Sequence, residues 1–218
     1  MSSLDGSPRV KICGCTTTDD IDLATNAGAD AIGVISQVSV DTHREVPIET
    51  ARTLVRHASP FVTTVLVTMP DSAAEARELL AEVRPDVVQL HGGIDTDEIA
   101  DIGADVPVIL AVDADEISDV ETALPGTAGL LLDSTDEHGA GGTGRTHDWE
   151  RAGQLVRSLD VPVILAGGLT PDNITRAVET VRPYAVDVAS GVEAENGKDP
   201  AVVRQFIRRA KGVKACPP

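Results

Sequence analysis

The chain has 218 residues, of which 35 are Asp or Glu and 18 are Lys or Arg, giving a formal net charge of −17 at pH 7. A surface with this excess of carboxylates repels nucleic acid and anionic membranes, so we expect neither as a partner. The acidity, the scarcity of lysine and the 2% of aromatic residues are typical of proteins from salt-loving organisms, whose carboxylate-rich surfaces stay hydrated in concentrated salt.

The first predicted strand begins at Arg9 and ends at Gly14. Side chains alternate across a strand, so Lys11 and Cys13 should face one way, while Val10 and Ile12 face the other. A lysine and a cysteine on one inward face favour a catalytic strand of an α/β barrel. A buried structural cysteine explains the same pattern, and this strand alone does not separate the two interpretations.

Strands and helices then alternate along the whole chain. Further strands are predicted at 31–35, 61–67, 87–91, 108–112, 129–133, 163–166 and 185–189. Helices are predicted at 19–26, 47–58, 71–83, 95–102, 115–123, 148–159, 171–181 and 199–211, with a short extra helix starting at Ser190 and a glycine-rich loop at 134–146.

This alternation is typical of a parallel sheet covered by helices. Eight units without a change in composition favour an α/β fold with a single (βα)8 TIM barrel, a closed parallel eight-stranded sheet spanning residues 1–218. Residues 1–8 should form a flexible amino terminus and 213–218 a tail. A flavodoxin-like or Rossmann sheet is the competing fold, and the absence of G-x-G-x-x-G after the first strand weakens it.

In such a barrel the functional residues lie at the carboxyl ends of the strands. Those ends carry Cys13, His91, Asp133, Gly167-Gly168 and Ser190-Gly191. A thiol and a carboxyl at the barrel mouth could act as base and acid on one substrate, although Asp133 could instead cap a loop. The glycine pairs after the seventh and eighth strands let backbone N–H groups approach an anion, which predicts a phosphate site.

Two further expectations concern the polar residues near this mouth. His91 is an obvious candidate base, but a hydrogen-bonded rim residue is the interpretation we prefer. In a closed barrel the eighth strand pairs with the first, so Lys11 and Asp187 should form an inward ion pair that also favours the Cys13 thiolate.

The three cysteines, Cys13, Cys15 and Cys216, are too few and too poorly spaced for a disulfide framework or a zinc site. They indicate a reducing compartment, and residues 1–8 contain no apolar signal segment. We therefore expect a cytoplasmic protein without a metal site, in which Cys15 and Cys216 are unreactive. The sequence leaves open whether it is a monomer or a homodimer.

Several motifs, in order and at compatible spacing over nearly the whole chain, resemble the phosphoribosylanthranilate isomerases of tryptophan biosynthesis. They are Val10-Lys11-Ile12-Cys13-Gly14, Gly28-Ala29-Asp30-Ala31-Ile32-Gly33, Val88-Gln89-Leu90-His91-Gly92, Leu132-Asp133-Ser134, the run from Gly141 to Trp149, Leu165-Ala166-Gly167-Gly168-Leu169, and Val186-Asp187-Val188-Ala189-Ser190-Gly191-Val192-Glu193.

The resemblance implies a (βα)8 barrel that converts N-(5-phosphoribosyl)anthranilate to 1-(2-carboxyphenylamino)-1-deoxyribulose 5-phosphate by an Amadori rearrangement without a cofactor. It implies that Cys13 is the general base, that Asp133 is the general acid and that Arg44 faces the anthranilate carboxylate. Backbone around Gly167-Gly168 and Ser190-Gly191 would hold the phosphate. The substrate-binding set expected from the strands and the resemblance is Lys11, Arg44, Gln89, His91 and Asp187.

Some positions depart from the family pattern, and none of them is the acid or the base. Cys15 replaces a common aliphatic residue, Val34-Ile35-Ser36 a more aromatic run, Arg145 a lysine and His147 a phenylalanine. The alternatives are another phosphosugar-processing barrel, such as an epimerase or indole-glycerol-phosphate synthase, and a non-catalytic barrel that binds a phosphorylated ligand. The epimerase would need a metal cluster and the synthase more lysines than the four present.

Overall fold

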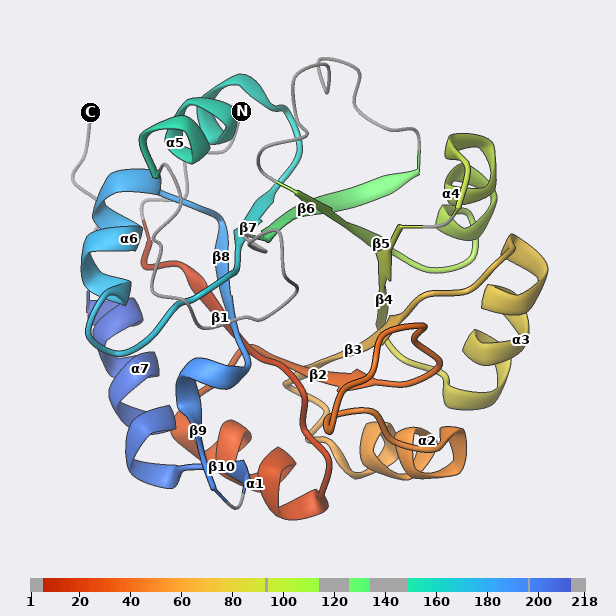
Figure 1. Ribbon diagram of the computed structural model, residues 1–218, viewed down its shortest axis with the longest axis horizontal. Coiled ribbons are helices and arrows are strands. Elements are labelled where there is room, and N and C mark those ends of the chain that lie inside the picture. The colour runs from red at the N-terminus through yellow and green to blue at the C-terminus, as the bar shows by residue number, and fades with distance from the viewer. Residues whose placement is uncertain (1–5, 93, 114–125, 134–148, 196, 213–218) are drawn as a thin grey trace.

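The computed structural model describes residues 6–92, 94–113, 126–133, 149–195 and 197–212. Eight parallel strands, joined in the order β1 to β8, close into a barrel that a ring of helices surrounds (Figure 1). The barrel strands are β1 (Arg9–Ile12), β2 (Ala31–Ile35), β3 (Thr63–Thr68), β4 (Val87–His91), β5 (Val108–Asp113), β6 (Thr127–Asp133), β7 (Val163–Leu165) and β8 (Ala185–Val188). The closed parallel barrel predicted from the sequence is confirmed.

The outer layer is helical. It consists of α1 (Thr18–Ala27), α2 (Ile48–His57), α3 (Ala73–Val83), α4 (Thr96–Gly103), α5 (Trp149–Ser158), α6 (Ile174–Val181) and α7 (Pro200–Gly212). Local chemistry sets the bounds of α1: Thr17 and Asp20 form a reciprocal capping box, and Gly28 ends the helix in the left-handed region at φ 93°. The predicted helix at 115–123 and the glycine-rich loop at 134–146 lie outside the described residues.

The barrel wall separates two apolar layers. Val10 and Ile12 of β1 point outward into the main core between barrel and helices. Cys13 points inward, where it packs with Val65 and Val67 of β3. This alternation, predicted for the first strand, puts Lys11 and Cys13 inside the barrel together.

Several element bounds differ from the sequence prediction by two or three residues, among them the starts of β6 at Thr127 and of α6 at Ile174, and two differences have a clear structural cause. The third strand begins at Thr63 rather than Phe61, because pairing with β2 starts at the Ala31–Thr63 register and the Phe61 side chain is 95% exposed. After β8, the chain forms a one-turn 3₁₀ helix, η1 (Ser190–Val192), as expected, and then an unpredicted antiparallel hairpin. Its strands are β9 (Glu193–Ala194) and β10 (Gly197–Lys198).

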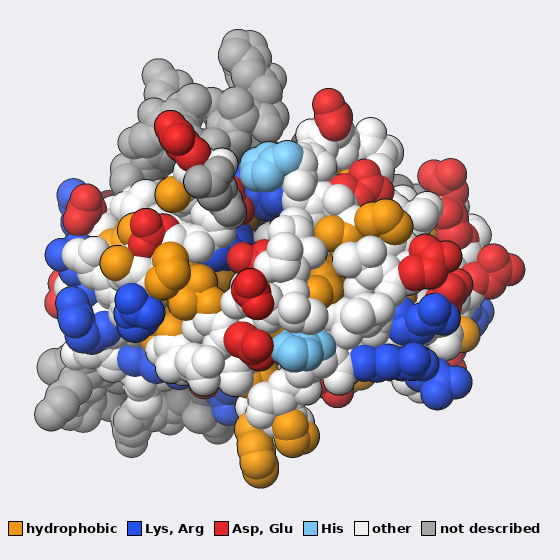
Figure 2. Space-filling view, turned by 90° about the horizontal axis from the view of Figure 1, so that it is seen from below, with side chains coloured by type: hydrophobic (Ala, Val, Ile, Leu, Met, Phe, Trp, Pro, Cys, Tyr) orange, Lys and Arg blue, Asp and Glu red, His pale blue; other side chains and the backbone are white. Residues whose placement is uncertain are grey.

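The acidic composition is visible on the surface. Figure 2 shows Asp and Glu side chains spread over one face of the molecule, with Lys and Arg mainly at its two sides. Among the described residues, no helix is both long enough and apolar enough to cross a membrane.

Candidate active site

A buried ion pair lies inside the barrel beneath Cys13. The register of β1 against β8 places Lys11 opposite Asp187, and Lys11 Nζ lies 2.9 Å from Asp187 Oδ2. Both side chains are nearly inaccessible to solvent, with exposed fractions of 5% and 9%. Closing the sheet thus joins residues that are 176 positions apart, and the predicted ion pair is confirmed.

Cys13 follows β1 directly, and its backbone N–H donates to Val188 O at 2.8 Å, which continues the β1–β8 pairing. Space for its thiol comes from Gly33 on β2: a Cβ built on Gly33 would lie 2.7 Å from Cys13 Sγ and 3.0 Å from Lys11 Cε. The absence of a side chain at position 33 therefore sets where the thiol and the lysine sit.

The expected effect of Lys11 on the Cys13 thiolate is present, but it is smaller than the opposing effect of burial. Burial raises the pKa of the Cys13 thiol, and this effect outweighs Lys11, which lowers it. Asp187 also raises the Cys13 pKa, so the Lys11–Asp187 pair lowers that pKa by less than Lys11 alone would. Burial alone would lower the pKa of Lys11, but Asp187 and Cys13 raise it, and the lysine stays charged.

Gln89 and His91 share the inward face of β4, because side chains two residues apart on a strand point the same way, and the Gln89 amide nitrogen lies 2.6 Å from His91 Nε2. Burial, with a further contribution from Lys11, lowers the pKa of His91 to about 4. A neutral imidazole can accept the amide N–H, so His91 is a hydrogen-bonded rim residue at neutral pH. This geometry supports the interpretation we preferred for it.

The expected acid, Asp133, is the last residue of β6 and is partly buried. It lies on the same strand face as Leu131, whose side chain fills the barrel interior, so the carboxyl is directed toward the barrel mouth. Three steps around the ring, through β8 and β7, separate β6 from β1. Cys13 and Asp133 therefore end two non-adjacent strands at the same end of the barrel.

The two glycine segments expected to hold phosphate lie against each other. Gly167 and Gly168 after β7 both adopt positive φ, 80° and 57°. A Cβ on Gly191 after β8 would collide with the carbonyl oxygen of Leu169, so only glycine fits there. Ser190 opens η1 beside them, and the four predicted phosphate-site residues therefore form one continuous backbone region.

Arg44 belongs to the loop between β2 and α2, and its guanidinium binds a carboxylate of this chain. Its Nε and Nη2 atoms donate to Glu193 Oε1 and Oε2 at 2.8 Å and 2.6 Å. Lys198 Nζ donates to the same Glu193 Oε1 at 2.7 Å. The sequence prediction of the site omitted Gly33, Glu193 and Lys198. The hairpin that brings Glu193 next to Lys198 could have been predicted, because the dipeptide Asn196-Gly197 is a common turn signal.

The other cysteine near the site is structural. Cys15 is fully buried, its Sγ lies 3.6 Å from Ile12 O, and burial raises its pKa to about 12. A thiol in this state does not ionise at neutral pH, which agrees with the expected lack of reactivity.

Ser36, at a position that departs from the family pattern, is buried and donates to Val46 O at 2.8 Å. Cys216, Arg145 and His147 lie outside the described residues.

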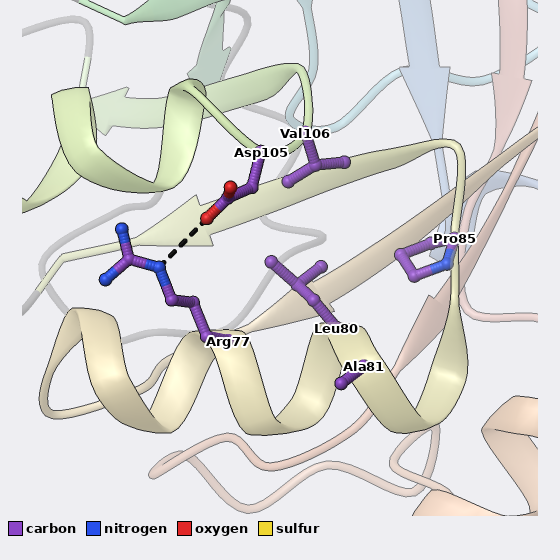
Figure 3. Close-up of a pocket in the computed structure, with 6 residues that line it drawn as sticks. All are labelled: Arg77, Leu80, Ala81, Pro85, Asp105 and Val106. Carbon is purple, nitrogen blue, oxygen red and sulfur yellow. Dashed lines mark hydrogen bonds and ion pairs between the residues drawn. The ribbon is translucent and has the colours of Figure 1, made fainter.

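A surface groove on the helical layer lies apart from these residues (Figure 3). It is lined by Arg77, Leu80, Ala81, Pro85, Asp105 and Val106. Pro85 and Val106 precede β4 and β5, so the groove lies at the amino ends of the strands, opposite the barrel mouth. Its one ion pair, Arg77–Asp105 at 2.9 Å, is solvent-exposed.

Within the described part of the chain, no group of three or more His, Cys, Asp or Glu residues is arranged to hold a metal ion.

A thiol and a carboxyl at one end of a closed barrel, next to two glycine turns at which backbone could approach an anion, are the arrangement expected of a TIM-barrel enzyme that processes a phosphorylated small molecule. The family model for N-(5'-phosphoribosyl)anthranilate isomerase matches residues 10–209. The chain belongs to this family of isomerases.

Several curated relatives with this family name come from salt-loving archaea, which fits the origin that the charge predicts. The chain is 52% identical to the protein of Haloferax volcanii, over 93% of each chain. It is 54% identical to that of Halorubrum lacusprofundi, over 93% of this chain and 96% of the relative.

Solved structures of the same family are similar to the chain in fold. The isomerase of Thermotoga maritima is similar with a TM-score of 0.83 and 35% identity, over 94% of this chain and 99% of that one. A family structure in complex with reduced 1-(o-carboxyphenylamino)-1-deoxyribulose 5-phosphate has a TM-score of 0.80 and 33% identity, over 94% and 99%.

Proposed function

We propose that the chain catalyses the Amadori rearrangement of N-(5-phosphoribosyl)anthranilate to 1-(2-carboxyphenylamino)-1-deoxyribulose 5-phosphate in tryptophan biosynthesis, with Cys13 as general base and Asp133 as general acid. The observation that carries the proposal is the meeting of Cys13, Asp133 and the glycine cradle at one end of the barrel, in a chain whose family model spans residues 10–209. A cytoplasmic location remains a prediction from the sparse cysteines.

The acid acts first. Asp133 donates a proton to the ring oxygen of the sugar as the bond between that oxygen and C1 breaks, and the anthranilate nitrogen forms an iminium ion with C1. The Cys13 thiolate then removes the proton from C2, and the electron pair moves to neutralise the iminium. The resulting enolamine tautomerises to the ketose, so the reaction is redox-neutral and no atom is gained or lost.

The surrounding residues supply charge and position. Lys11 offsets part of the cost of ionising the buried Cys13 thiol, since its charge lowers the Cys13 pKa. Asp187 Oδ1 and Gln89 Oε1 are buried acceptors with no hydrogen-bond partner among the described residues, and the sugar hydroxyls are suitable donors for them. Backbone at Gly167-Gly168 and Ser190-Gly191 binds the phosphate, and Arg44 binds the anthranilate carboxylate.

The experiment follows the decay of phosphoribosylanthranilate fluorescence with purified variants. We expect Cys13→Ser and Asp133→Asn each to lower kcat by at least about 100-fold with KM little changed, because each removes one proton-transfer group. Cys15→Ala, which deletes the buried neighbouring thiol, is the matched control and should keep kcat. His91→Asn should cost much less than either active-site change.

Wild-type protein that binds the substrate without converting it would support the non-catalytic barrel instead. If His91→Asn abolished turnover while Cys13→Ser preserved it, the assignment of the base would be wrong.

A further inference from the structure

Three charged side chains form a bridge over the carboxyl end of β1, between the segments that follow β2 and β8, and we name it the Arg44–Glu193–Lys198 bridge. Arg44 comes from the loop between β2 and α2, and Glu193 and Lys198 come from the hairpin after β8. Glu193 accepts hydrogen bonds from both cations, at 2.6–2.8 Å. Burial alone would raise the pKa of Glu193, but Arg44 and Lys198 outweigh it and lower the pKa to about 2. The Glu193 carboxyl is therefore ionised at neutral pH.

The hairpin fixes the carboxylate from the β8 side. Glu193 and Lys198 are opposite each other in the β9–β10 register. The Lys198 side chain is only 2% exposed, and its Nζ also donates to Ala189 O at 3.1 Å, at the end of β8. A buried lysine held by a carbonyl and a carboxylate has little freedom, so the position of Glu193 is set by the barrel rather than by Arg44.

Arg44 is held at both ends of its side chain. Its stem crosses the backbone of Gly14, where a built Cβ would lie 2.5 Å from Arg44 Cδ and 3.2 Å from Cγ. Gly14 is the residue after Cys13, so the stem passes next to the proposed base. The guanidinium presents its Nε–Nη2 edge to Glu193. A guanidinium has five N–H donors, and its Nη1–Nη2 edge can still receive a second carboxylate in bidentate geometry.

We propose that Glu193 is a positioning residue: it holds Arg44 over Gly14 so that the free edge of the guanidinium receives the carboxylate of the substrate's aromatic ring. The inference rests on the proposed function, in which Arg44 binds that carboxylate. Arg44, Glu193 and Lys198 together carry one excess positive charge, which one substrate carboxylate balances. Glu193 thereby makes the site selective for a carboxylated arylamine over an uncharged one.

The test measures kcat and KM for two substrates, phosphoribosylanthranilate and N-(5-phosphoribosyl)aniline, which lacks the carboxylate. Glu193→Gln should raise KM for phosphoribosylanthranilate by about 10–100-fold, the range expected when a charge-assisted contact is lost. The KM of the aniline analogue and the kcat of both substrates should change little. Glu195→Gln is the matched control, because it removes the same charge from an exposed position of the same hairpin and should change neither KM.

Removing Glu193 also leaves Lys198 buried without its carboxylate, and a second variant addresses that effect. Glu193→Gln/Lys198→Met deletes both buried charges, and it should retain the loss of preference for the carboxylated substrate. Recovery of wild-type KM in this double variant would overturn the proposal, because the defect would then come from the unpaired lysine. The double variant also serves if Glu193→Gln alone does not fold.

Two more measurements distinguish a failure of the positioning role of Glu193 from a failure of the proposed role of Arg44. Inhibition by inorganic phosphate should be the same in wild type and Glu193→Gln; a parallel weakening would mean that Glu193 acts on the phosphate cradle, and the positioning role would be wrong. If Arg44→Gln abolishes the preference for the carboxylate and Glu193→Gln does not, the inference fails while Arg44 keeps its role. If neither variant changes the preference, the carboxylate-binding role of Arg44 itself fails.

Discussion

The missing side chain at position 33 provides the sharpest test of how the barrel positions its thiol. Gly33 lies on β2, and a Cβ there would sit 2.7 Å from Cys13 Sγ, 3.0 Å from Lys11 Cε and 3.1 Å from Lys11 Nζ. Non-bonded heavy atoms normally approach to about 3.5–4.0 Å, so the sulfur must move by about 1 Å or the strands must separate. The perturbation is Gly33→Ala, which adds one methyl group.

The expected losses of stability and of rate follow from the crowding around the added methyl group. Adding a methyl group to a well-packed interior costs about 1–3 kcal/mol. For a chain of this size that corresponds to a fall in Tm of roughly 2–12 °C. A 1 Å misplacement of a reacting group can lower the rate by about 100-fold. The loss should appear in kcat rather than KM, because the groups proposed to bind phosphate and carboxylate do not touch the added methyl group.

The assay is the fluorescence decay of phosphoribosylanthranilate, with Tm measured by circular dichroism on the same preparations. Gly212→Ala is the matched control: the same methyl group is added at the end of α7, where no described atom lies within 4 Å of the added Cβ, so kcat should stay unchanged and Tm should not fall. A Gly33→Ala enzyme with unchanged kcat and reduced Tm would refute the link between this packing and the thiol's position.

Two more predictions come from charge. The net charge of −17 predicts that Tm falls as salt is lowered from molar concentration to dilute buffer, because like charges are then less screened, and an unchanged Tm would contradict this. Lys11 lowers and Asp187 raises the pKa of Cys13, so Lys11→Met should shift the pH profile of thiol alkylation to higher pH and Asp187→Asn to lower pH. Since the proposed base acts as a thiolate, kcat should rise with pH through the raised Cys13 pKa, and an alkylation profile unmoved by Lys11→Met would rule out the electrostatic role of Lys11.

Much of this protein could be predicted from its sequence because the relevant signals are local. Apolar runs of strand length alternate with helical patterns eight times, and that alternation leads to a parallel barrel. Side-chain alternation placed Lys11 and Cys13 on one inward face, and closure of the barrel predicted that Lys11 would meet Asp187. Strand ends pointed to Cys13 and Asp133, which lie at the same end of the barrel, and the glycines after the last two strands pointed to the backbone region that we propose binds phosphate.

Only the tertiary structure decided which charges meet and how deeply each is buried. Arg44 and Glu193 are 149 positions apart, in a loop and a two-residue strand that carry no periodic pattern, so no local signal joins them. The importance of Gly33 depends on the thiol and lysine of the neighbouring strand. The raised pKa of Cys13 depends on burial, which outweighs the lysine visible two residues away in the sequence. Local chemistry therefore determines where strands and helices form, whereas desolvation and long-range contacts, which act only in the closed barrel, determine the chemistry of its mouth.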